Sequence, residues 1–258
     1  NRTHNTQPIM LAAGVAVWRV WIASGGCQPA LMAGHSFGEY TALVCSGALD
    51  YTDALPLAQQ RGQLMQSAVP EGQGAMAAIL GLKDHQVVEI CESAAEDQVV
   101  AAVNFNSPVQ VVIAGDKAAV ERVLHLASKA GARRVIPLAV SVPAHCRLMA
   151  SAARKLAESL AKITFKPPKI PVLHNVDVKT HTDANEIREV LAQQLEHPVR
   201  WTETIQTMDS QGVNLILEMG PGKVLTGLNK RIERKLKALC VQDPAGLEMA
   251  LQYCEDTQ

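Results

Sequence analysis

Aromatic residues are scarce in this sequence: Phe, Trp and Tyr together make up 3% of its 258 residues. Hydrophobic residues still account for 48% of the chain, so a sizeable core must be built from Ala, Val, Leu and Ile. The chain also lacks an excess of charge of either sign, since 24 Lys and Arg stand against 25 Asp and Glu and the net charge is −1. Proteins that bind nucleic acid through its phosphates need a basic excess, so we expect no nucleic-acid partner.

Paired cysteines and long hydrophobic runs are missing as well. The six cysteines show no C-x-x-C spacing, which argues against a zinc site or a disulfide framework and favours a reducing, cytoplasmic compartment. No apolar run reaches the roughly 18 residues of a membrane span. Residues 9–22 are apolar but include Arg19, which is more typical of a buried helix. We therefore expect neither a metal nor a membrane partner.

The order of the predicted elements indicates an α/β protein. A helix from Pro8 to about Ser24, ended by two glycines, precedes a short buried strand over residues 30–34. Strands separated by helices pair in parallel and are covered on both faces. Further strands are predicted over residues 170–173, 213–219 and 238–241, and further helices over residues 39–45, 53–68, 148–161, 185–195, 201–211, 224–236 and 246–254.

A different order of elements occupies residues 73–140. Strand, helix, strand, strand, helix and strand follow one another there, which is the order of a ferredoxin-like βαββαβ unit. We therefore predict that residues 73–140 form a subdomain inserted into a larger domain made of residues 1–72 and 141–258. The six elements are predicted over residues 75–80, 84–95, 99–106, 110–114, 117–130 and 133–138.

The strongest local signal for chemistry is Gly34-His35-Ser36-Phe37-Gly38, which fits G-x-S-x-G. It lies between a predicted strand and a predicted helix, the context in which this motif exposes a nucleophilic serine on a sharp turn. The helix N-terminus and the amide of Phe37 would then face a developing oxyanion. The alternative is an ordinary β-α turn bracketed by glycines, and the flanking elements favour a nucleophile at Ser36.

A serine hydroxyl needs a base, and three histidines are candidates. His145 follows the predicted insertion, where the chain re-enters the large domain, but position alone does not separate it from His174 and His197. His35 adjoins the serine, but the turn should direct its ring away. No Asp or Glu near His145 suggests itself as a third member, so a backbone carbonyl could fix the imidazole tautomer instead.

Arg61 follows on the helix after the nucleophile, beside Gly62. An arginine facing a pocket there would bind a substrate carboxylate through two parallel hydrogen bonds. From the sequence alone, a solvated arginine on the helix surface is the favoured alternative.

Several longer motifs together resemble bacterial malonyl-CoA:acyl-carrier-protein transacylases of type II fatty acid synthesis, over essentially the whole chain. As a set they are far more specific than G-x-S-x-G alone. They read GHSFGEYTALVCSGAL from Gly34, QQRGQLMQ from Gln59, GAMAAILGL from Gly74, VNFNSPVQVVIAG from Val103, VSVPAHC from Val140, PVLHNVDV from Pro171 and EMGPGKVLTGL from Glu218.

This resemblance implies a fold, an activity and a set of site residues. The fold is an α/β-hydrolase-like domain with a ferredoxin-like insertion. Ser36 would carry the malonyl group, His145 would be the base, and Arg61 would bind the malonyl carboxylate. The backbone carbonyl of Gln194 would orient the histidine, and the amide of Phe37 would donate to the oxyanion. The substrates would be malonyl-CoA and acyl carrier protein, with no cofactor, in a monomer.

Two departures from the family pattern bear on these roles. Family members begin with a strand and a GQGSQ-type loop whose first glutamine supplies a second oxyanion donor, and this sequence starts downstream of it. Loss of one such donor typically costs about 10²–10³ in rate. Phe37 also stands where many members have Leu, and Ala144, beside the base, where many have Ser.

Three other functions remain open at this point. A thioesterase or hydrolase could use the same serine turn, although a plain acyl group would leave a buried Arg61 unpaired. An acyltransferase of a polyketide pathway would use the same chemistry. A non-catalytic carrier-docking module is the third. For docking of an acidic carrier protein, the basic residues on the predicted helix 224–236 and just after it are candidates: Lys230, Arg231, Arg234, Lys235 and Lys237.

Overall fold

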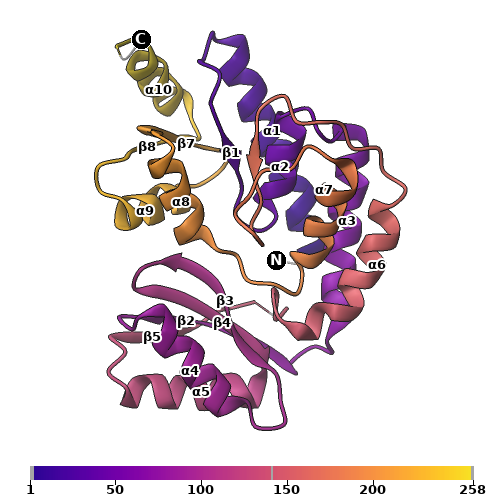
Figure 1. Cartoon of the computed structure of the whole chain (residues 1–258), viewed down its shortest axis with the longest axis vertical. Coiled ribbons are helices and arrows are strands. Elements are labelled where there is room, and N and C mark those ends of the chain that lie inside the picture. The colour runs from indigo at the N-terminus through magenta and orange to yellow at the C-terminus, as the bar shows by residue number, and fades with distance from the viewer. Residues whose placement is uncertain (1–2, 141, 257–258) are drawn as a thin grey trace.

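The computed structural model describes residues 3–140 and 142–256 and confirms the α/β class (Figure 1). Helices surround two short parallel sheets in one part of the molecule, and a four-stranded antiparallel sheet forms the other. The first part contains α1 (Thr3–Ala23), β1 (Met32–Ala33), α2 (Gly38–Cys45), α3 (Tyr51–Ala68), a 3-10 helix (Arg147–Met149), α6 (Ala150–Leu160), β6 (Val172–Leu173), α7 (Ala184–Gln193), α8 (Trp201–Ser210), β7 (Leu215–Met219), α9 (Val224–Ile232), β8 (Lys237–Val241) and α10 (Pro244–Asp256).

The four-stranded sheet has the topology of a ferredoxin-like unit. Its elements are β2 (Gly74–Leu80), α4 (Asp84–Ala95), β3 (Val100–Ser107), β4 (Gln110–Asp116), α5 (Lys117–Lys129) and β5 (Arg134–Pro137). The spatial order is β3-β4-β2-β5, and all neighbouring strands are antiparallel. Helices α4 and α5 cover one face of the sheet (Figure 1). The expected order of elements is therefore confirmed, whereas residue 141, at the predicted domain boundary, lies outside the described residues.

Backbone hydrogen bonds join the two parts. The amide of Phe105 on β3 donates to the carbonyl of Val199 at 3.0 Å, and the amide of Val199 donates to the carbonyl of Val103 at 2.9 Å. Together they form a parallel β-bridge between Asn104 at the edge of the antiparallel sheet and Val199 in the segment before α8. The segment leading to α8 is thus tied to the four-stranded sheet.

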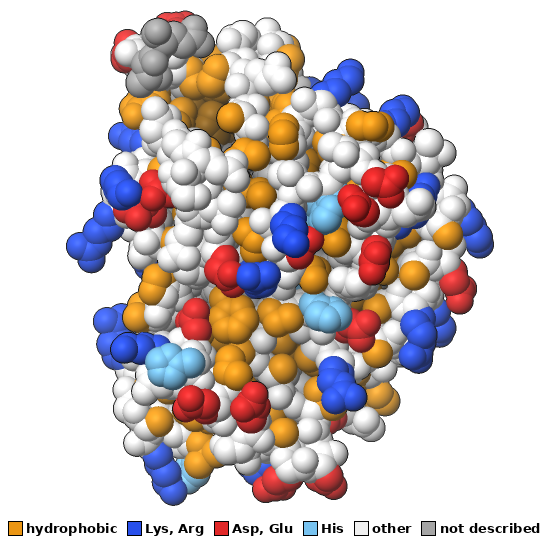
Figure 2. Space-filling view, in the orientation of Figure 1, with side chains coloured by type: hydrophobic (Ala, Val, Ile, Leu, Met, Phe, Trp, Pro, Cys, Tyr) orange, Lys and Arg blue, Asp and Glu red, His pale blue; other side chains and the backbone are white. Residues whose placement is uncertain are grey.

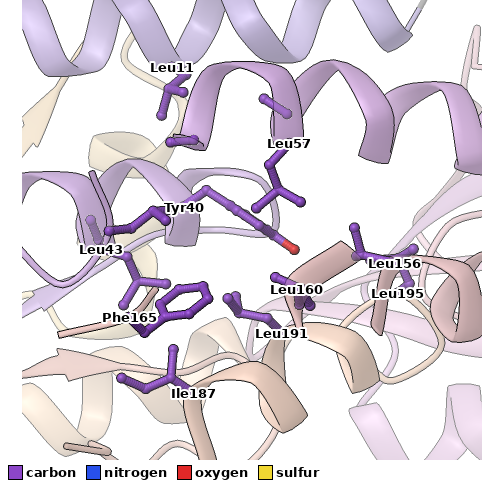
Figure 3. Close-up of a cluster of buried hydrophobic side chains, with 14 of the residues drawn as sticks. Leu11, Tyr40, Leu43, Leu57, Leu156, Leu160, Phe165, Ile187, Leu191 and Leu195 are labelled. Atoms are coloured by element: carbon purple, nitrogen blue, oxygen red, sulfur yellow. The ribbon is translucent and has the colours of Figure 1, made fainter. Parts of the chain in front are cut away.

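Aliphatic side chains dominate the largest core, as the composition predicts. Helices α1, α2, α3, α6 and α7 contribute to it, and Tyr40 and Phe165 are its buried aromatic members (Figure 3). Such close packing of small and branched side chains fixes the mutual positions of α2, α3 and α7. These three helices carry or precede the residues of the site described below.

The first helix differs from its predicted form. It begins at Thr3, so Pro8 lies inside it rather than at its start. It buries Leu11 and Val15 but leaves Ile9 66% exposed, so it is only partly a core helix. Residues Asn5–Ala23 are long and apolar enough to span a membrane by length and composition, in contrast to the estimate from the sequence. A single such helix is weak evidence for a span, because core helices meet the same criteria.

Helix α9 ends earlier than predicted. Glu233 has the extended conformation φ −137°, ψ 108°, and terminates the helix at Ile232. Only Lys230 and Arg231 of the basic residues therefore lie on α9. Arg234 and Lys235 follow in the turn, and Lys237 opens β8.

Candidate active site

Ser36 lies on a sharp turn between β1 and α2, as the motif predicts. Its φ of 52° is in the left-handed region, which few non-glycine residues adopt. Gly34 makes this turn possible: a Cβ there would lie 1.9 Å from the carbonyl carbon of Gly38. Asn175, just after β6, holds the turn from outside, because its Oδ1 accepts from the Ser36 amide at 2.7 Å and its Nδ2 donates to the Gly34 carbonyl at 2.7 Å.

His145 is the histidine that the fold brings to Ser36. Nε2 of His145 lies 2.7 Å from Oγ of Ser36, and Nδ1 lies 2.7 Å from the carbonyl oxygen of Gln194. A carbonyl can only accept, so the proton is on Nδ1 and Nε2 is free to accept the serine proton. The His145 backbone has a φ of 65°, and its amide donates to the carbonyl of Leu195 at 2.8 Å.

The surroundings of His145 keep its imidazole neutral. Burial, and secondarily the positive charge of Arg61, lower the pKa of His145 to about 3. The hydrogen bond to the Gln194 carbonyl opposes this shift. A neutral imidazole beside a hydroxyl is the state that a general base requires before the reaction begins.

The other candidate histidines are occupied elsewhere. His174 is buried against Glu39, with Nδ1 and Oε1 2.7 Å apart, and His197 places Nδ1 2.9 Å from the carbonyl of Gln193. His35 donates from Nε2 to Oδ1 of Asn106 at 2.8 Å, and its ring contacts that of Trp201. The geometry therefore separates the three histidines that the sequence left open.

Arg61 is buried, so the expectation of a solvated arginine is wrong. Its side chain is 1% exposed and reaches from α3 toward the serine turn. Nη1 donates to Oε1 of Gln7 at 2.9 Å, and Nη2 donates to Oε1 of Gln194 at 2.9 Å and to Oγ of Ser36 at 3.4 Å. Burial lowers the pKa of Arg61, but a guanidinium retains its proton in proteins. A cation thus lies within hydrogen-bond distance of the nucleophile.

Two aromatic rings complete the surroundings of this cation. The guanidinium carbon lies 5.8 Å from the ring centre of Phe37 and 5.4 Å from that of Tyr40, and the two rings stack on each other. Phe37 has helical backbone angles directly before α2, which orients its amide with those of the helix N-terminus.

The sequence did not single out Gln7, Glu39 or Asn175, nor the side chain of Gln194. Each contacts a predicted site residue from a distant part of the chain, so spacing alone could not reveal it. Glu39 carried one usable signal, since it is an acidic residue in a short helix that is otherwise mostly apolar.

No group of three or more His, Cys, Asp or Glu among residues 3–140 and 142–256 could hold a metal ion.

A serine that is hydrogen-bonded to a neutral imidazole and lies next to a buried cation suits transfer of an acyl group that carries a negative charge. The charged residues on the face shown in Figure 2 are of both signs and lie around hydrophobic side chains between the two parts of the molecule.

Comparison with known proteins agrees with this chemistry. A family model described as "Acyl transferase domain" matches residues 1–241. The malonyl CoA-acyl carrier protein transacylase of Salmonella typhimurium is 57% identical over 251 residues, covering 97% of this chain and 81% of that protein. The one from Bacillus subtilis is 43% identical over 255 residues, covering 98% and 80%.

Solved structures are equally similar. A malonyl CoA-acyl carrier protein transacylase from Coxiella burnetii superimposes with a TM-score of 0.96 at 49% identity, covering 97% of this chain and 79% of that one. A malonyl-transacylase in complex with a type II PKS acyl-carrier protein superimposes with a TM-score of 0.97 at 55% identity, covering 98% and 82%.

Proposed function

The chain belongs to the family of acyl transferase domains, and on this basis we propose that its serine site moves a malonyl group from malonyl-CoA to the phosphopantetheine thiol of acyl carrier protein. The product supplies extender units for fatty acid synthesis. One observation supports the site assignment above all: Oγ of Ser36 lies 2.7 Å from the base His145 and 3.4 Å from the cation Arg61. This arrangement combines an activated nucleophile with a group that recognises a carboxylate.

In the first half-reaction, Ser36 attacks the thioester carbonyl of malonyl-CoA. The hydroxyl proton passes to Nε2 of His145 as the new C–O bond forms. When the tetrahedral intermediate collapses, the C–S bond breaks and the leaving CoA thiolate takes the proton from His145. The result is malonyl-serine and CoA, with the imidazole neutral again.

In the second half-reaction, the phosphopantetheine thiol of the carrier protein gives its proton to His145. Its sulfur attacks the malonyl-serine carbonyl, the C–O bond to Ser36 breaks, and the serine oxygen recovers the proton. The backbone carbonyl of Gln194 holds the imidazole in the required tautomer throughout, at 2.7 Å from Nδ1. The amide of Phe37 donates to the oxyanion that forms in each step.

Arg61 selects the acyl group in this proposal. Moving a carboxylate out of water costs several kcal/mol unless it is paired, and a guanidinium pairs it with fixed geometry. The neutral amide oxygens of Gln7 and Gln194 hold the cation in place, each at 2.9 Å, before the substrate binds. Pairing between Arg61 and the substrate carboxylate would distinguish a malonyl transferase from a thioesterase, whose uncharged acyl group would leave Arg61 unpaired.

No cofactor takes part in the proposed reaction, since CoA and phosphopantetheine are carriers of the acyl group. We also propose that the enzyme acts in the cytoplasm as a monomer. The scattered cysteines support that compartment. The proposed division of labour puts the chemistry in residues 1–72 and 141–258, and the ferredoxin-like residues 73–140 beside it.

Mass spectrometry of the intact protein tests the proposal. Mixed with malonyl-CoA, the wild type should gain one malonyl group, and Ser36→Ala should gain none while keeping its fold. Adding carrier protein that bears phosphopantetheine should move the malonyl group to the carrier. A malonyl adduct on Ser36→Ala would exclude Ser36 as the nucleophile, and release of free malonate in place of transfer would identify a hydrolase. A carrier protein from a polyketide pathway, tested in parallel, would reveal that second use of the same site.

A further inference from the structure

Glu39 is a buried acidic residue to which the reaction assigns no task. It lies in the first turn of α2, three residues after the nucleophile, and is 0% exposed. Acidic side chains are almost never fully buried unless they are paired, because removing a charge from water is costly. Its burial beside the active site therefore needs an explanation in its contacts.

Three donors meet the two oxygens of this carboxylate. Nδ1 of His174 lies 2.7 Å from Oε1. The amide of Asn175 donates to Oε2 at 2.9 Å, and Nε2 of Gln194 donates to the same oxygen at 2.8 Å. The contacts thus come from the segment after β6 and from the end of α7, two places far from α2 in the sequence.

The partners of Gln194 establish which way its amide points. Its Oε1 accepts from Arg61, which has only donors, and its Nε2 donates to the carbonyl of Ser36 at 3.0 Å, which can only accept. The second Nε2 hydrogen therefore points at Oε2 of Glu39. With the Asn175 amide, two N–H groups converge on that oxygen, so it is unprotonated.

His174 faces the other oxygen of Glu39. Nδ1 of His174 and Oε1 of Glu39 are 2.7 Å apart, and a carboxylate oxygen accepts the proton that Nδ1 donates. With the Asn175 amide and the Gln194 side chain, three donors thus converge on the carboxylate of Glu39.

Through these donors Glu39 reaches every member of the reacting group. Gln194 orients Arg61 through a hydrogen bond to its side-chain oxygen, and orients His145 through a hydrogen bond to its main-chain oxygen. Asn175 passes its position to the amide of Ser36. We propose that Glu39 is a positioning residue: its carboxylate fixes the Gln194 side chain, and thereby sets the distance between the carboxylate-binding cation and the nucleophile.

The inference rests on the proposed function and makes a specific claim within it. If Glu39 acts through Gln194, its loss should release the Gln194 amide and leave Arg61 less well placed. Malonyl transfer should suffer more than acetyl transfer, because only the malonyl group uses the cation. A purely structural role would lower both by the same factor.

The test measures kcat/KM for acylation by malonyl-CoA and by acetyl-CoA in Glu39→Gln, Gln194→Ala and the double variant. Glu39→Gln should lower the malonyl-to-acetyl ratio by about 10–100-fold, the loss expected when hydrogen bonds to a charged group are removed. In the Gln194→Ala background, Glu39→Gln should change the ratio no further, since the two residues act through one contact.

Glu218 offers a matched control. Its carboxylate also accepts from three donors, the amides of Leu225 and Thr226 and the Thr226 hydroxyl, but it does so at the start of α9. Glu218→Gln should lower stability and leave the ratio at the wild-type value. If Glu39→Gln fails to fold, Glu39→Asp keeps the charge but is one methylene too short to reach Gln194, and it should show the same fall in ratio.

Folded Glu39→Gln or Glu39→Asp with a wild-type ratio would overturn the proposal. Additive effects of the Glu39 and Gln194 substitutions, or an equal change of ratio in Glu218→Gln, would do so as well. Each of these results would leave malonyl-serine formation by the wild type intact, so failure of this inference is distinct from failure of the proposed function.

Discussion

Nη2 of Arg61 lies 3.4 Å from Oγ of Ser36, so the cation that would bind the substrate carboxylate also touches the nucleophile. Arg61 lies on α3 and Ser36 on the turn before α2, and the core shown in Figure 3 holds these two helices together. Recognition and reaction therefore occur within one hydrogen-bond length of each other. A carboxylate one carbon away from the thioester carbonyl suits this short separation.

Replacement of Arg61 should change which acyl group is transferred. Arg61→Ala should lose most malonyl transfer and keep or gain acetyl transfer, because the substrate carboxylate loses its partner and no cation remains buried. Arg61→Lys should also be impaired, since an ammonium cannot form two parallel hydrogen bonds with a carboxylate. The measurement is the ratio of the two kcat/KM values. An unchanged ratio in Arg61→Ala would place the carboxylate elsewhere.

The pKa of His145 makes a prediction about acid. Because that pKa is lowered to about 3, His145 should stay neutral at pH values well below 6.5, the ordinary pKa of histidine. The rate of acylation should therefore not change with pH in that range. Arg61→Ala removes a positive neighbour, so the acidic limb of the pH profile of kcat/KM should move to higher pH.

His145→Ala should slow both half-reactions by about 10²–10⁴. An unimpaired rate in this variant would shift the role of base to another residue.

The same shift should appear in stability. Between pH 6.5 and about 3 the unfolded chain binds a proton at His145 that the folded chain does not, so the free energy of unfolding should fall as the pH falls through this window. His145→Ala lacks this contribution. The stability difference between wild type and variant, measured by urea unfolding at several pH values, should therefore change across the window and be constant above it.

The turn before α2 should not accept a side chain at its first glycine. A Cβ at Gly34 would lie 1.9 Å from the Gly38 carbonyl carbon, so Gly34→Ala should destabilise the protein by about 3 kcal/mol. Gly38→Ala is the control, because a Cβ there meets nothing within 4 Å. It should be neutral or stabilise by up to about 1 kcal/mol. Thermal unfolding of both variants checks the contrast, and equal effects would refute it.

The basic residues around the end of α9 predict a docking surface for an acidic carrier protein. Lys230 and Arg234 are exposed, whereas Lys235 is already paired with Asp209 at 3.0 Å. Lys230→Glu combined with Arg234→Glu should raise KM for the carrier protein and leave KM for malonyl-CoA unchanged. Lys155→Glu, on the exposed side of α6, should change neither. Equal effects on both substrates, or none, would argue for a merely solvated surface.

The thiols of Cys27 and Cys254 lie 2.7 Å apart, one after α1 and one on α10. With oxidised glutathione, the pair should lose two hydrogens to form a disulfide, while two molecules of reduced glutathione are released. Burial and the neighbouring Cys27 thiol raise the pKa of Cys254 to about 11, so the reaction should speed up as the pH rises. Peptide mapping identifies the bond, and Cys27→Ser is the control. Persistent thiols at high pH would contradict the prediction.

Local patterns predicted the elements well where capping and periodicity act alone. Helix α4 has the predicted bounds, and the ferredoxin-like order follows from the succession of elements. The start of α1 was missed because Pro8 was taken to lie in the first turn, where proline is usually found, whereas it lies farther inside the helix. The end of α9 was missed because Glu233 adopts an extended conformation that its residue type does not demand.

The site was predictable only in part, for a physical reason. Spacing identified Ser36, because a nucleophile turn needs small residues at fixed offsets. The burial of Arg61 was not visible, because the residues that surround it, Gln7, Tyr40 and Gln194, come from three separate segments. Among the histidines, the choice depended on where the chain returns after residue 140, which only the assembled fold decides.

The order of the site residues along the chain has a consequence for biosynthesis. Ser36 precedes His145 by 109 positions, and the whole antiparallel sheet is made between them. Protein chains fold from the N-terminal side as they emerge from the ribosome. A nascent chain that ends before residue 145 thus carries Ser36 without its base and without Asn175, which holds the serine turn. An unassisted hydroxyl is a poor nucleophile. The growing polypeptide should not react with thioesters until α7 has packed against the rest of the domain and Nδ1 of His145 has formed its hydrogen bond to the carbonyl of Gln194.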